Sequence, residues 1–551
     1  MPPMPGPFIL IEGFYSLSES QTFGMVVSVK KLLANLCVRY LRVTLSLCDR
    51  LDSRRIHHPA RLAYVIDGVE RDNQTSIDHV FRIANGLIAS GIGKGDRIAV
   101  LSRNSVECAE VMTAILCSGA SMVPVPSTAT AEAQKNMLLD SAVKGLFVSD
   151  QYRDAALAHF MDLPTLRPDL RFALESACDQ FRDHVAWAKT FETVSPGVHM
   201  ALEDEYDILY SSGTTGVPKG IIHSHLARNL LIAGTEKMAF EGGVVLTSTP
   251  LYSNTTITTW WPSVWVGATQ VIMRKFNAER ANELIRDYAI THAMLVPVQY
   301  QRMWAAANHS SDNWRSVRWL FSTSAPLSAV MKERILADTS AQLLEFYGLT
   351  EGGVATTLIA RKAAELGKLG SVGQVQAGGE LRILGENGEL LGPNEAGEIV
   401  GRTGIMSDGY LNREEATKAM HWFDEDGRLF YRSGDVGYLD EDGWLFLSDR
   451  IKDMILSGGQ NIYATDLEQA LNAMPDVVES AVVAKPSEEW GETPWAFVVR
   501  RADSDRGEED IRLDANKQLS PIQAIAGVTF MDELPRSDIG KILKRQLRDT
   551  F

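Results

Sequence analysis

Short apolar runs alternate with longer mixed stretches along most of this chain, from about residue 60 onward. The apolar runs predict a series of buried strands. They lie at 97–101, 121–125, 145–148, 206–210, 244–248, 269–273 and 292–296. Between them, the segments 106–117 and 278–288 predict helices. Strands that alternate with helices favour parallel sheets covered by helices, so the sequence predicts an α/β fold.

The pattern changes between about residues 370 and 450. Strand-like runs there are separated by turns such as Glu386-Asn387-Gly388 and the segment 440–443. The runs lie at 380–384, 398–401, 429–432 and 444–447. Strands linked by tight turns predict hairpins, so we expect an antiparallel, barrel-like unit in this region. A smaller α+β segment is expected at 453–551.

Length and composition limit the class of protein. A chain of 551 residues exceeds a single ordinary core, so two or more domains are expected. The apolar fraction of 45% and the charged fraction of 23% are typical of a soluble globular protein. The net charge of −16 disfavours a nucleic-acid partner, which requires a basic face. The five cysteines are odd in number and lack CxxC spacing, which argues against a disulfide framework or a zinc site and favours the cytoplasm.

The N-terminal segment shows no transmembrane or signal-peptide pattern. Four basic residues interrupt the apolar stretch at 23–48, so no run reaches the roughly 20 residues that a membrane span needs. Residues 1–20 lack the basic region of a signal peptide. A surface-lying amphipathic helix at 28–47 is an alternative interpretation.

The segment 211–220, Ser-Ser-Gly-Thr-Thr-Gly-Val-Pro-Lys-Gly, directly follows a predicted strand and carries the clearest chemistry. Its glycines let the backbone turn N–H groups toward an anion, and its four hydroxyl groups add neutral donors. Lys219 adds a mobile positive charge, which suits a polyphosphate. The segment is not a Walker loop, because Pro218 precedes the lysine and Gly220 follows it. The alternative, a solvated loop, rests on composition alone.

In this order of residues, the loop resembles the signature of the adenylate-forming, AMP-binding superfamily, and within it the acyl-CoA synthetase and CoA ligase branch. Later segments resemble the other signatures of the superfamily, in the same order along the chain. They are Tyr347-Gly348-Leu349-Thr350-Glu351, Tyr431-Arg432-Ser433-Gly434-Asp435, Asp449-Arg450-Ile451-Lys452-Asp453, Ser457-Gly458-Gly459-Gln460-Asn461-Ile462, and Pro535-Arg536-Ser537 with Gly540-Lys541. The resemblance covers about residues 50 to 548.

The resemblance implies a large N-terminal domain and a small, mobile α+β C-terminal domain. The large domain would contain two parallel-type αβ sheets and a small β-barrel. The expected bounds are 51–451 for the large domain, with α/β subdomains to about 369 and the barrel-like part at 370–451, and 452–551 for the C-terminal domain, with a hinge at Lys452. Residues 1–50 fall outside the resemblance and are either an extension or the result of an upstream start codon.

The resemblance also implies roles for individual residues in binding ATP. The phosphates would contact Ser211, Ser212, Gly213, Thr214, Thr215, Gly216 and Lys219. AMP would contact Ser324, Ala325, Pro326, Tyr347, Gly348, Asp435 and Arg450. Asp435 would accept both ribose hydroxyls, and Tyr347 would stack on the adenine, whereas serine at 324 departs from the family's glycine. Glu351 would bind Mg²⁺, which takes only one or two protein oxygens, and Thr350 would contact the α-phosphate.

The family carries out two steps, and the resemblance assigns residues to each. In the first, Lys541 would bring positive charge to the substrate carboxylate and the α-phosphate. The C-terminal domain would then rotate about Lys452. In the second step, Ser457, Gly458 and Gly459 would line the tunnel for the pantetheine arm of CoA, because glycine lets the arm pass close to the backbone.

The segment that follows Pro250 bears on the identity of the acid. The candidate acyl-pocket residues are Tyr252, Ser253, Asn254 and Trp260. CoA ligases of this family often have histidine where Ser253 stands, and amino-acid-activating domains have an aspartate. The absence of that aspartate disfavours an amino-acid substrate, and the aromatic side chains favour an apolar aryl, alicyclic or medium-to-long-chain acid.

Other aromatic and histidine residues nearby are interpreted as structural. Trp261 and Trp265 share one face of a predicted helix, which favours core packing. His223 and His225, just after the 211–220 loop, are also interpreted as structural.

The sequence therefore predicts an ATP-dependent carboxylic acid–CoA ligase that uses ATP, CoA and Mg²⁺. Its partners would be small molecules and not a nucleic acid. No transmembrane segment is expected. One alternative is a stand-alone adenylation enzyme that loads a carrier protein. An alternative of another class is an inactive regulator that binds a nucleotide or acyl-CoA, although the presence of Lys219, Glu351, Asp435 and Lys541 together argues against it. A luciferase-like oxidation is disfavoured.

Overall fold

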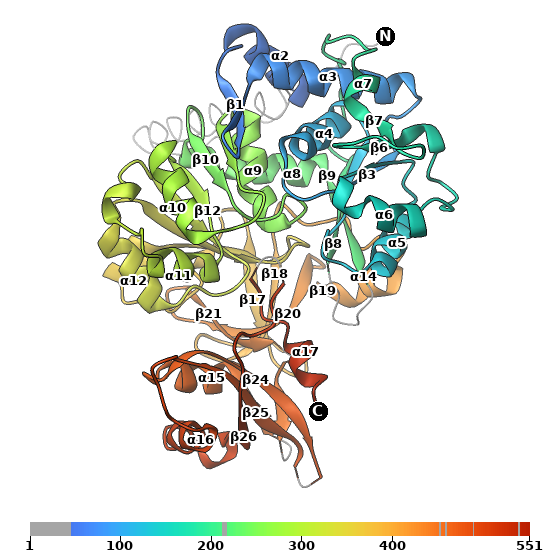
Figure 1. Ribbon diagram of the computed structural model, residues 1–551. Coiled ribbons are helices and arrows are strands. Elements are labelled where there is room, and N and C mark those ends of the chain that lie inside the picture. Colours follow the sequence, from blue (N-terminus) through green and yellow to red (C-terminus); the bar gives the residue numbers. More distant parts are fainter. Residues whose placement is uncertain (1–45, 212–217, 451–452, 458–459, 489, 538–539) are drawn as a thin grey trace, which may run out of the picture. The chain divides into compact units, whose positions relative to one another are not determined.

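The structure is a computed structural model that describes residues 46–551, apart from 212–217, 451–452, 458–459, 489 and 538–539 (Figure 1). The chain divides into two compact units, Met1–Ser46 and Leu47–Phe551, and every helix and strand described below lies in the second. The amphipathic helix considered at 28–47 lies outside the described residues, except for its last two positions.

A nine-stranded sheet forms one half of the large α/β region. Its strands follow the order β16-β15-β14-β13-β12-β10-β11-β1-β2. Their bounds are β1 Leu62–Ile66, β2 Val69–Asp72, β10 Val244–Thr247, β11 Thr269–Ile272, β12 His292–Met294, β13 Trp319–Ser322, β14 Gln342–Gly348, β15 Ala355–Ile359 and β16 Gln374–Val375. The six strands from β14 to β1 pair in parallel, and the edge strands are antiparallel. Figure 1 shows α10 (Ala278–Asp287), α11 (Pro297–Ala305) and α12 (Ala329–Asp338) beside this sheet.

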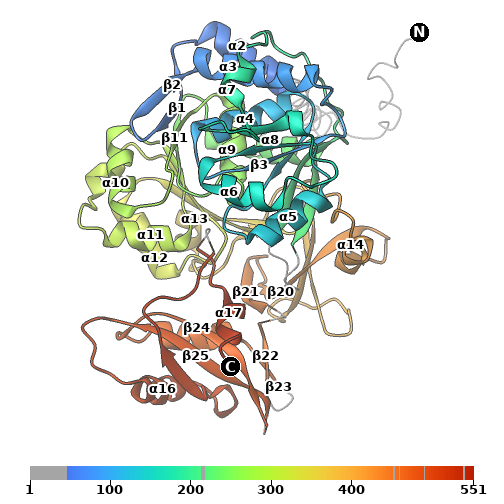
Figure 2. The same cartoon turned by 45° about the vertical axis from the view of Figure 1, so that its right-hand side comes forward.

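A seven-stranded sheet forms the other half, in the order β7-β6-β5-β3-β4-β8-β9. Its strands are β3 Arg97–Leu101, β4 Ser121–Pro124, β5 Gly145–Val148, β6 Arg171–Ala173, β7 Arg182–Asp183, β8 Glu205–Ser211 and β9 Lys219–Ser224. All its pairs are parallel except β8 with β9, which form a hairpin around the 211–220 loop. Helices α5 (Ala131–Asp140) and α6 (Asp150–His159) lie against this sheet (Figure 2).

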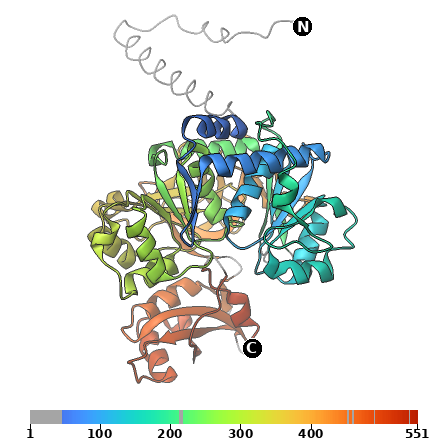
Figure 3. The ribbon, with the colours of Figure 1, turned by 45° about the horizontal axis from the view of Figure 1, so that its top comes forward.

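Helices fill the space between the two sheets (Figure 3). They are α2 Leu47–His57, α3 Asn73–Ala89, α4 Val106–Cys117, α8 His225–Gly234 and α9 Asn254–Val266, with the short α7 His184–Ala188 beside α3. One hydrophobic cluster joins residues of these helices to both sheets, including Phe81, Ile115 and Trp260. Because both faces of each sheet are covered, the central strands such as β3, β5 and β10 are apolar along their length, which is why their runs were visible in the sequence.

Antiparallel strands follow in the region expected to be barrel-like. They are β17 Glu380–Leu384, β18 Gly397–Arg402, β19 His421–Phe423, β20 Leu429–Leu439 and β21 Leu445–Arg450, with α13 Ala360–Glu365 before them and α14 Glu414–Met420 among them. The order is β17-β18-β20-β19, and β21 pairs with β20. Gly388 and Gly443 have φ values of +86° and +75°, which the tight turns at these positions require.

The C-terminal segment has its own sheet and core. The sheet has the order β23-β22-β25-β24, with β26 paired to β25. Its elements are β22 Ile455–Ser457, β23 Gln460–Ile462, α15 Ala464–Asn472, β24 Val477–Ser487, β25 Gly491–Arg500, α16 Glu508–Asn516, β26 Gly527–Phe530 and α17 Lys544–Arg548. A separate hydrophobic cluster, which includes Leu467, Val498 and Ile511, packs within it.

The expected α/β class, with two parallel-type sheets and an α+β C-terminal segment, is confirmed. Element ends differ slightly from the sequence expectation. The run at 292–296 forms a strand only to Met294, because Val296 caps α11 and its N–H donates to Gln299 Oε1 at 3.2 Å instead of to a neighbouring strand. Short 3₁₀ helices complete the connections at Pro168–Leu170, Glu236–Met238, Ser311–Trp314 and Pro521–Gln523. Among the described residues, no helix is both long and apolar enough to cross a membrane.

Candidate active site

The candidate site lies at the carboxyl ends of the parallel strands of the nine-stranded sheet. The segments that follow β10, β13 and β14 carry, respectively, residues 248–254, Ser324–Pro326 and Leu349–Glu351. Parallel strands end at the same edge of a sheet, so these segments are brought together even though they are far apart in sequence. Such an edge is the usual ligand-binding position in open α/β sheets.

The β8–β9 hairpin presents the two ends of the predicted phosphate loop. Ser211, the last residue of β8, pairs with Lys219, the first residue of β9. The residues between them that were assigned to the phosphates lie outside the described part of the chain. These are Ser212, Gly213, Thr214, Thr215 and Gly216.

Tyr410 joins Lys219 to Glu351. Its hydroxyl donates a hydrogen bond to Glu351 Oε1 at 2.6 Å, and the Lys219 ammonium lies 4.9 Å from the centre of its ring. Burial and, next, the charge of Glu351 raise the pKa of Tyr410, which therefore stays a donor. The tyrosine is held there because Leu411 N–H donates to the Gly220 carbonyl at 2.8 Å, so residues 408–411 run beside β9.

Thr350 is connected to the interior by His223. The Nε2 of His223 donates to the Thr350 carbonyl oxygen at 2.8 Å, and its Nδ1 lies 2.8 Å from Oδ1 of Asp207. Asp207 and His223 are buried on β8 and β9. His223, interpreted as structural from the sequence, thus also contacts the predicted catalytic segment directly, at the carbonyl of Thr350. His225 packs edge-on against Tyr206, with ring centroids 4.9 Å apart, and burial lowers its pKa to about 4.

A second acidic group, Asp435, lies on the antiparallel strand β20. Its carboxylate accepts a hydrogen bond from the Tyr347 hydroxyl at 2.8 Å and pairs with Arg450 Nε at 3.0 Å. Burial, followed by the charge of Asp435, raises the pKa of Tyr347 well above its usual value. Three residues assigned to AMP from separate motifs are thus in contact with one another.

The segment Ser324–Pro326 has an unusual backbone. Ser324 has φ +78°, a conformation that glycine adopts freely and serine rarely does. Its hydroxyl lies 2.5 Å from Oγ1 of Thr255, near the start of α9. The departure from the family's glycine therefore keeps a glycine-like backbone and adds a hydroxyl contact. Gly348 ends β14, where a Cβ would come 2.5 Å from the Val354 carbonyl oxygen, so no larger residue fits.

The substrate segment leads into α9. Ser253 caps this helix by accepting from Thr255 N–H, and Tyr252 precedes it. Asn254 is half-buried, and its Oδ1 accepts from Arg228 Nη1 at 3.0 Å. Trp260 is fully buried in the core, beside Trp261, with ring centroids 4.3 Å apart, so its place in an acyl pocket stays a prediction.

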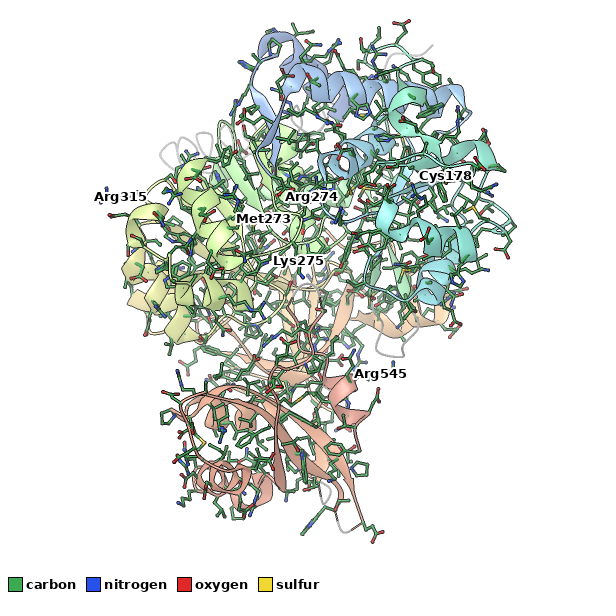
Figure 4. The ribbon with its side chains drawn as sticks, viewed as in Figure 1. Cys178, Met273, Arg274, Lys275, Arg315 and Arg545 are labelled. Atoms are coloured by element: carbon green, nitrogen blue, oxygen red, sulfur yellow. The ribbon has the colours of Figure 1, made fainter. Side chains whose placement is uncertain are left out.

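Asn104 holds this segment in position. It is buried, donates to the carbonyls of Thr249 and Met273, and accepts from Leu251 N–H at 2.9 Å. Figure 4 labels Met273, which directly follows β11 in the interior of the large α/β region. The side chain of Asn104 thus connects the segments that directly follow two neighbouring parallel strands, β10 and β11.

The C-terminal residues are described in part. The N–H of Ser537 donates to the Lys541 carbonyl at 2.9 Å. A Cβ on Gly540, the residue before Lys541, would come 2.7 Å from Cγ1 of Val298, in the first turn of α11. Ser457 ends β22, whereas Lys452, Gly458 and Gly459 lie outside the described residues.

Metal binding at this site would depend on few protein ligands. In the described part of the chain, no group of three or more His, Cys, Asp or Glu side chains is arranged to hold a metal ion. Glu351 accepts one hydrogen bond and keeps further lone pairs for a cation. This fits Mg²⁺, which binds through one or two carboxylates together with substrate phosphates and water.

Four residues of this region were missed by sequence reasoning: Asn104, Asp207, Arg228 and Tyr410. Asp207 carried a visible signal, because a carboxylate inside a predicted buried strand requires a partner. Tyr410 had no comparable signal, since it lies 59 residues from Glu351 in a loop.

Comparison with known proteins identifies the family of this chain. The model of the AMP-binding enzyme family matches residues 57–411, and that of the AMP-binding enzyme C-terminal domain matches residues 466–541. The chain belongs to the AMP-binding enzyme family. Within that family it is an AMP-forming acid–thiol ligase of the acyl- and aryl-CoA ligase group.

Two curated relatives and one solved structure illustrate the similarity. The chain is 30% identical over 509 residues to the fatty acid–[acyl-carrier-protein] ligase ScoC of Streptomyces coeruleorubidus, covering 90% of this chain and 94% of ScoC. It is 31% identical over 477 residues to the long-chain-fatty-acid–CoA ligase FadD13 of Mycobacterium tuberculosis, covering 85% and 91%. The ATP-bound crystal structure of MatB from Rhodopseudomonas palustris has a TM-score of 0.81 and 27% identity, covering 92% of this chain and 98% of MatB.

Proposed function

We propose that this ligase first joins a carboxylic acid to AMP and then transfers the acyl group to the thiol of CoA. In the first step, a carboxylate oxygen attacks the α-phosphorus of ATP and pyrophosphate leaves. In the second, the thiol sulfur attacks the acyl carbon and AMP leaves. The observation that carries this proposal is the meeting of Lys219 and Glu351 at Tyr410, beside the strand ends that bear Ser324 and Thr350.

The residues have separate tasks in the first step. Lys219 and the hydroxyl groups of its loop hold the departing phosphates, which carry most of the charge. Glu351 would hold Mg²⁺, and the metal would neutralise phosphate charge when bound. Asp435 accepts the ribose hydroxyls, with its orientation maintained by Arg450 and Tyr347.

Lys541 contributes positive charge where the carboxylate meets the α-phosphate. The packing of Gly540 against Val298 supports this role, because Val298 closely follows the end of β12, at the same edge of the sheet. For the second step, we propose that the domain at 452–551 turns about Lys452. That turn brings Ser457, Gly458 and Gly459 to the acyl-adenylate.

The substrate is proposed to be an apolar aryl, alicyclic or medium-to-long-chain acid. Trp260 and Trp261, in the middle of α9, form a buried aromatic cluster with Tyr206, and the apolar surroundings of this helix support an apolar acyl group. Neither Ser253 nor Asn254 supplies an anion for a substrate ammonium group. The names of ScoC and FadD13, which act on fatty acids, also agree with this class.

A carrier protein is the second candidate acceptor. The specific observation in its favour is the similarity to ScoC, whose name states that it joins fatty acids to acyl carrier protein. A pyrophosphate-release assay with a panel of acids tests the first step, and thioester formation measured with CoA or with a phosphopantetheinylated carrier protein separates the two acceptors. Thioester formation with the carrier protein alone would replace CoA in the proposal, and absence of acid-dependent pyrophosphate release would indicate a binding protein without activity.

The variant Lys541→Ala separates the two steps. Loss of one transition-state donor should lower acyl-adenylate formation by about 100-fold or more. The conversion of pre-formed acyl-adenylate to thioester should be nearly unchanged, because Lys541 acts only before that point. Equal loss of both half-reactions would contradict the assignment.

A further inference from the structure

A buried ion pair between Arg228 and Asp207 contacts Asn254, the first residue of α9. The Arg228 guanidinium binds Asp207 with two parallel hydrogen bonds, from Nε to Oδ2 and from Nη2 to Oδ1, each 2.9 Å long. Asp207 is completely buried and Arg228 is 3% exposed. Burial acts to raise the pKa of Asp207, but the charges of Arg228 and His223 outweigh it and lower the pKa, so the carboxylate stays ionised.

The remaining nitrogen of the same guanidinium, Nη1, determines the orientation of the Asn254 side-chain amide. Arg228 Nη1 lies 3.0 Å from Asn254 Oδ1. A guanidinium has donors only, so the atom that faces it must be the amide oxygen. The amide Nδ2, with its two N–H donors, is then directed away from Arg228. Because Asp207 occupies the other two nitrogens of the fork, the orientation of Arg228 is fixed and so is that of Asn254.

Asn254 is connected through its neighbours to two segments of the proposed nucleotide site. Its neighbour in α9, Thr255, contacts Ser324 with oxygens 2.5 Å apart. On the other side, His223 contacts both Asp207 and the Thr350 carbonyl. Asn254 is half-buried, whereas the network behind it is closed to solvent. The hydrogen-bond network around Asn254 thus reaches both Ser324 and Thr350, the residues to which the proposed function assigns contacts with AMP.

We propose that Asn254 Nδ2 donates a hydrogen bond to the carboxylate of the acid substrate, and that Arg228, held by Asp207, is the positioning residue that keeps the amide turned toward it. The proposal rests on the proposed function and adds to it a preference against substrates with an α-ammonium group. The amide group that Asn254 turns away from Arg228 is a donor, because the amide oxygen faces the guanidinium. A substrate with an ammonium group beside its carboxylate would place one donor against another, so the site should reject α-amino acids.

Three variants test this inference through the KM for octanoate, the preference for octanoate over 2-aminooctanoate, and the Kd for AMP. Asn254→Leu removes the donor and should raise the KM for octanoate about 10- to 100-fold, as expected for one hydrogen bond to a charged group. Asn254→Asp should raise the KM for octanoate further, because the new carboxylate would face the carboxylate of the substrate. This variant should also narrow the preference for octanoate over 2-aminooctanoate. Arg228→Lys keeps the charge but lacks the planar fork that binds Asp207 and Asn254 together. It should raise the KM for octanoate while the Kd for AMP changes less than twofold.

Asn277→Asp is the matched control. It makes the same chemical change at an exposed helix cap, where asparagine and aspartate serve equally well, and should leave the kinetics unchanged. Calorimetric titration of octanoate and benzoate into the AMP-bound protein gives a readout that needs no turnover and also serves if Arg228→Lys does not fold. Weaker binding to Asn254→Leu than to the wild type supports the inference.

The failure of this inference is distinct from the failure of the proposed function. If the wild type releases pyrophosphate with octanoate but Asn254→Leu keeps its octanoate KM and calorimetric affinity within twofold, the ligase assignment stands and the role of Asn254 is wrong. The same conclusion follows if Asn254→Leu weakens AMP and octanoate equally. If the wild type binds neither acid in the calorimeter, the inference is also overturned.

Discussion

The link between Tyr410 and Glu351 can be tested by the single change Tyr410→Phe. This variant removes one hydroxyl and keeps the ring that lies 4.9 Å from the Lys219 ammonium. The lost hydrogen bond is 2.6 Å long and has a charged acceptor, which corresponds to about 1.5–3 kcal/mol. At about 1.4 kcal/mol per tenfold change, kcat/KM for ATP should fall between about 10- and 150-fold at limiting Mg²⁺.

Mg²⁺ titration and nucleotide binding show whether the loss arises at Glu351. The Mg²⁺ concentration for half-maximal pyrophosphate release should rise in Tyr410→Phe, because Glu351 is no longer held in one orientation. The Kd for AMP without metal should change less than twofold. Tyr410→Leu also removes the ring and should cost about 0.5–1 kcal/mol more through Lys219.

A double-mutant cycle with Glu351→Gln decides whether the two residues act together. In the Glu351→Gln background, Tyr410→Phe should have a much smaller effect than in the wild type, because the charged acceptor is already gone. Tyr438→Phe, which changes a tyrosine stacked on Phe446 in the same antiparallel unit, is the matched control. Equal effects of Tyr410→Phe in both backgrounds, or no effect at all, would refute the reasoning.

Three further predictions concern stability, nucleotide binding and domain movement. Burial lowers the pKa of His292 from 6.5 to about 4, so the unfolded state takes up a proton first as the pH falls. Urea unfolding should show stability falling between pH 6.5 and pH 4 by up to about 3 kcal/mol, and falling less in His292→Gln; a pH dependence identical in both proteins would exclude His292 as a cause. Asp435→Asn should raise the Kd for AMP about 10-fold or more in calorimetry, since the ribose hydroxyls lose a charged acceptor, and unchanged affinity would remove Asp435 from the site. Lys452→Pro fixes φ at the proposed hinge and should slow thioester formation more than adenylate formation in single-turnover assays; matching defects would argue against a hinge.

The individual strands and helices were largely predictable from the sequence. The expected strands at 97–101, 145–148 and 380–384 match β3, β5 and β17 residue for residue, and the helix at 106–117 matches α4. These elements are buried on both faces or bounded by clear turns, so a local run of apolar residues is enough to define them. The motif residues were equally visible, because each motif is contiguous.

The contacts between motifs were not predictable in the same way. The pair Tyr347–Asp435 joins residues 88 apart, and Thr255–Ser324 joins residues 69 apart. Ser324 also has a positive φ that its residue type does not suggest. Nothing in the local pattern indicates which polar group will meet which, because the partners lie in different sheets, helices and loops that only the packing of the whole fold brings together.

The chain's own sequence thus determined the fold class, the order of the motifs and the types of side chain available for ATP chemistry, since these depend on local burial and local composition. Only the tertiary structure decided that Tyr410 lies between Lys219 and Glu351 and that Arg228 turns the amide of Asn254. The physical reason is that these residues come from strands, helices and loops that only the folded chain brings together, where hydrogen-bond geometry over a few ångströms, and not sequence distance, selects the partners.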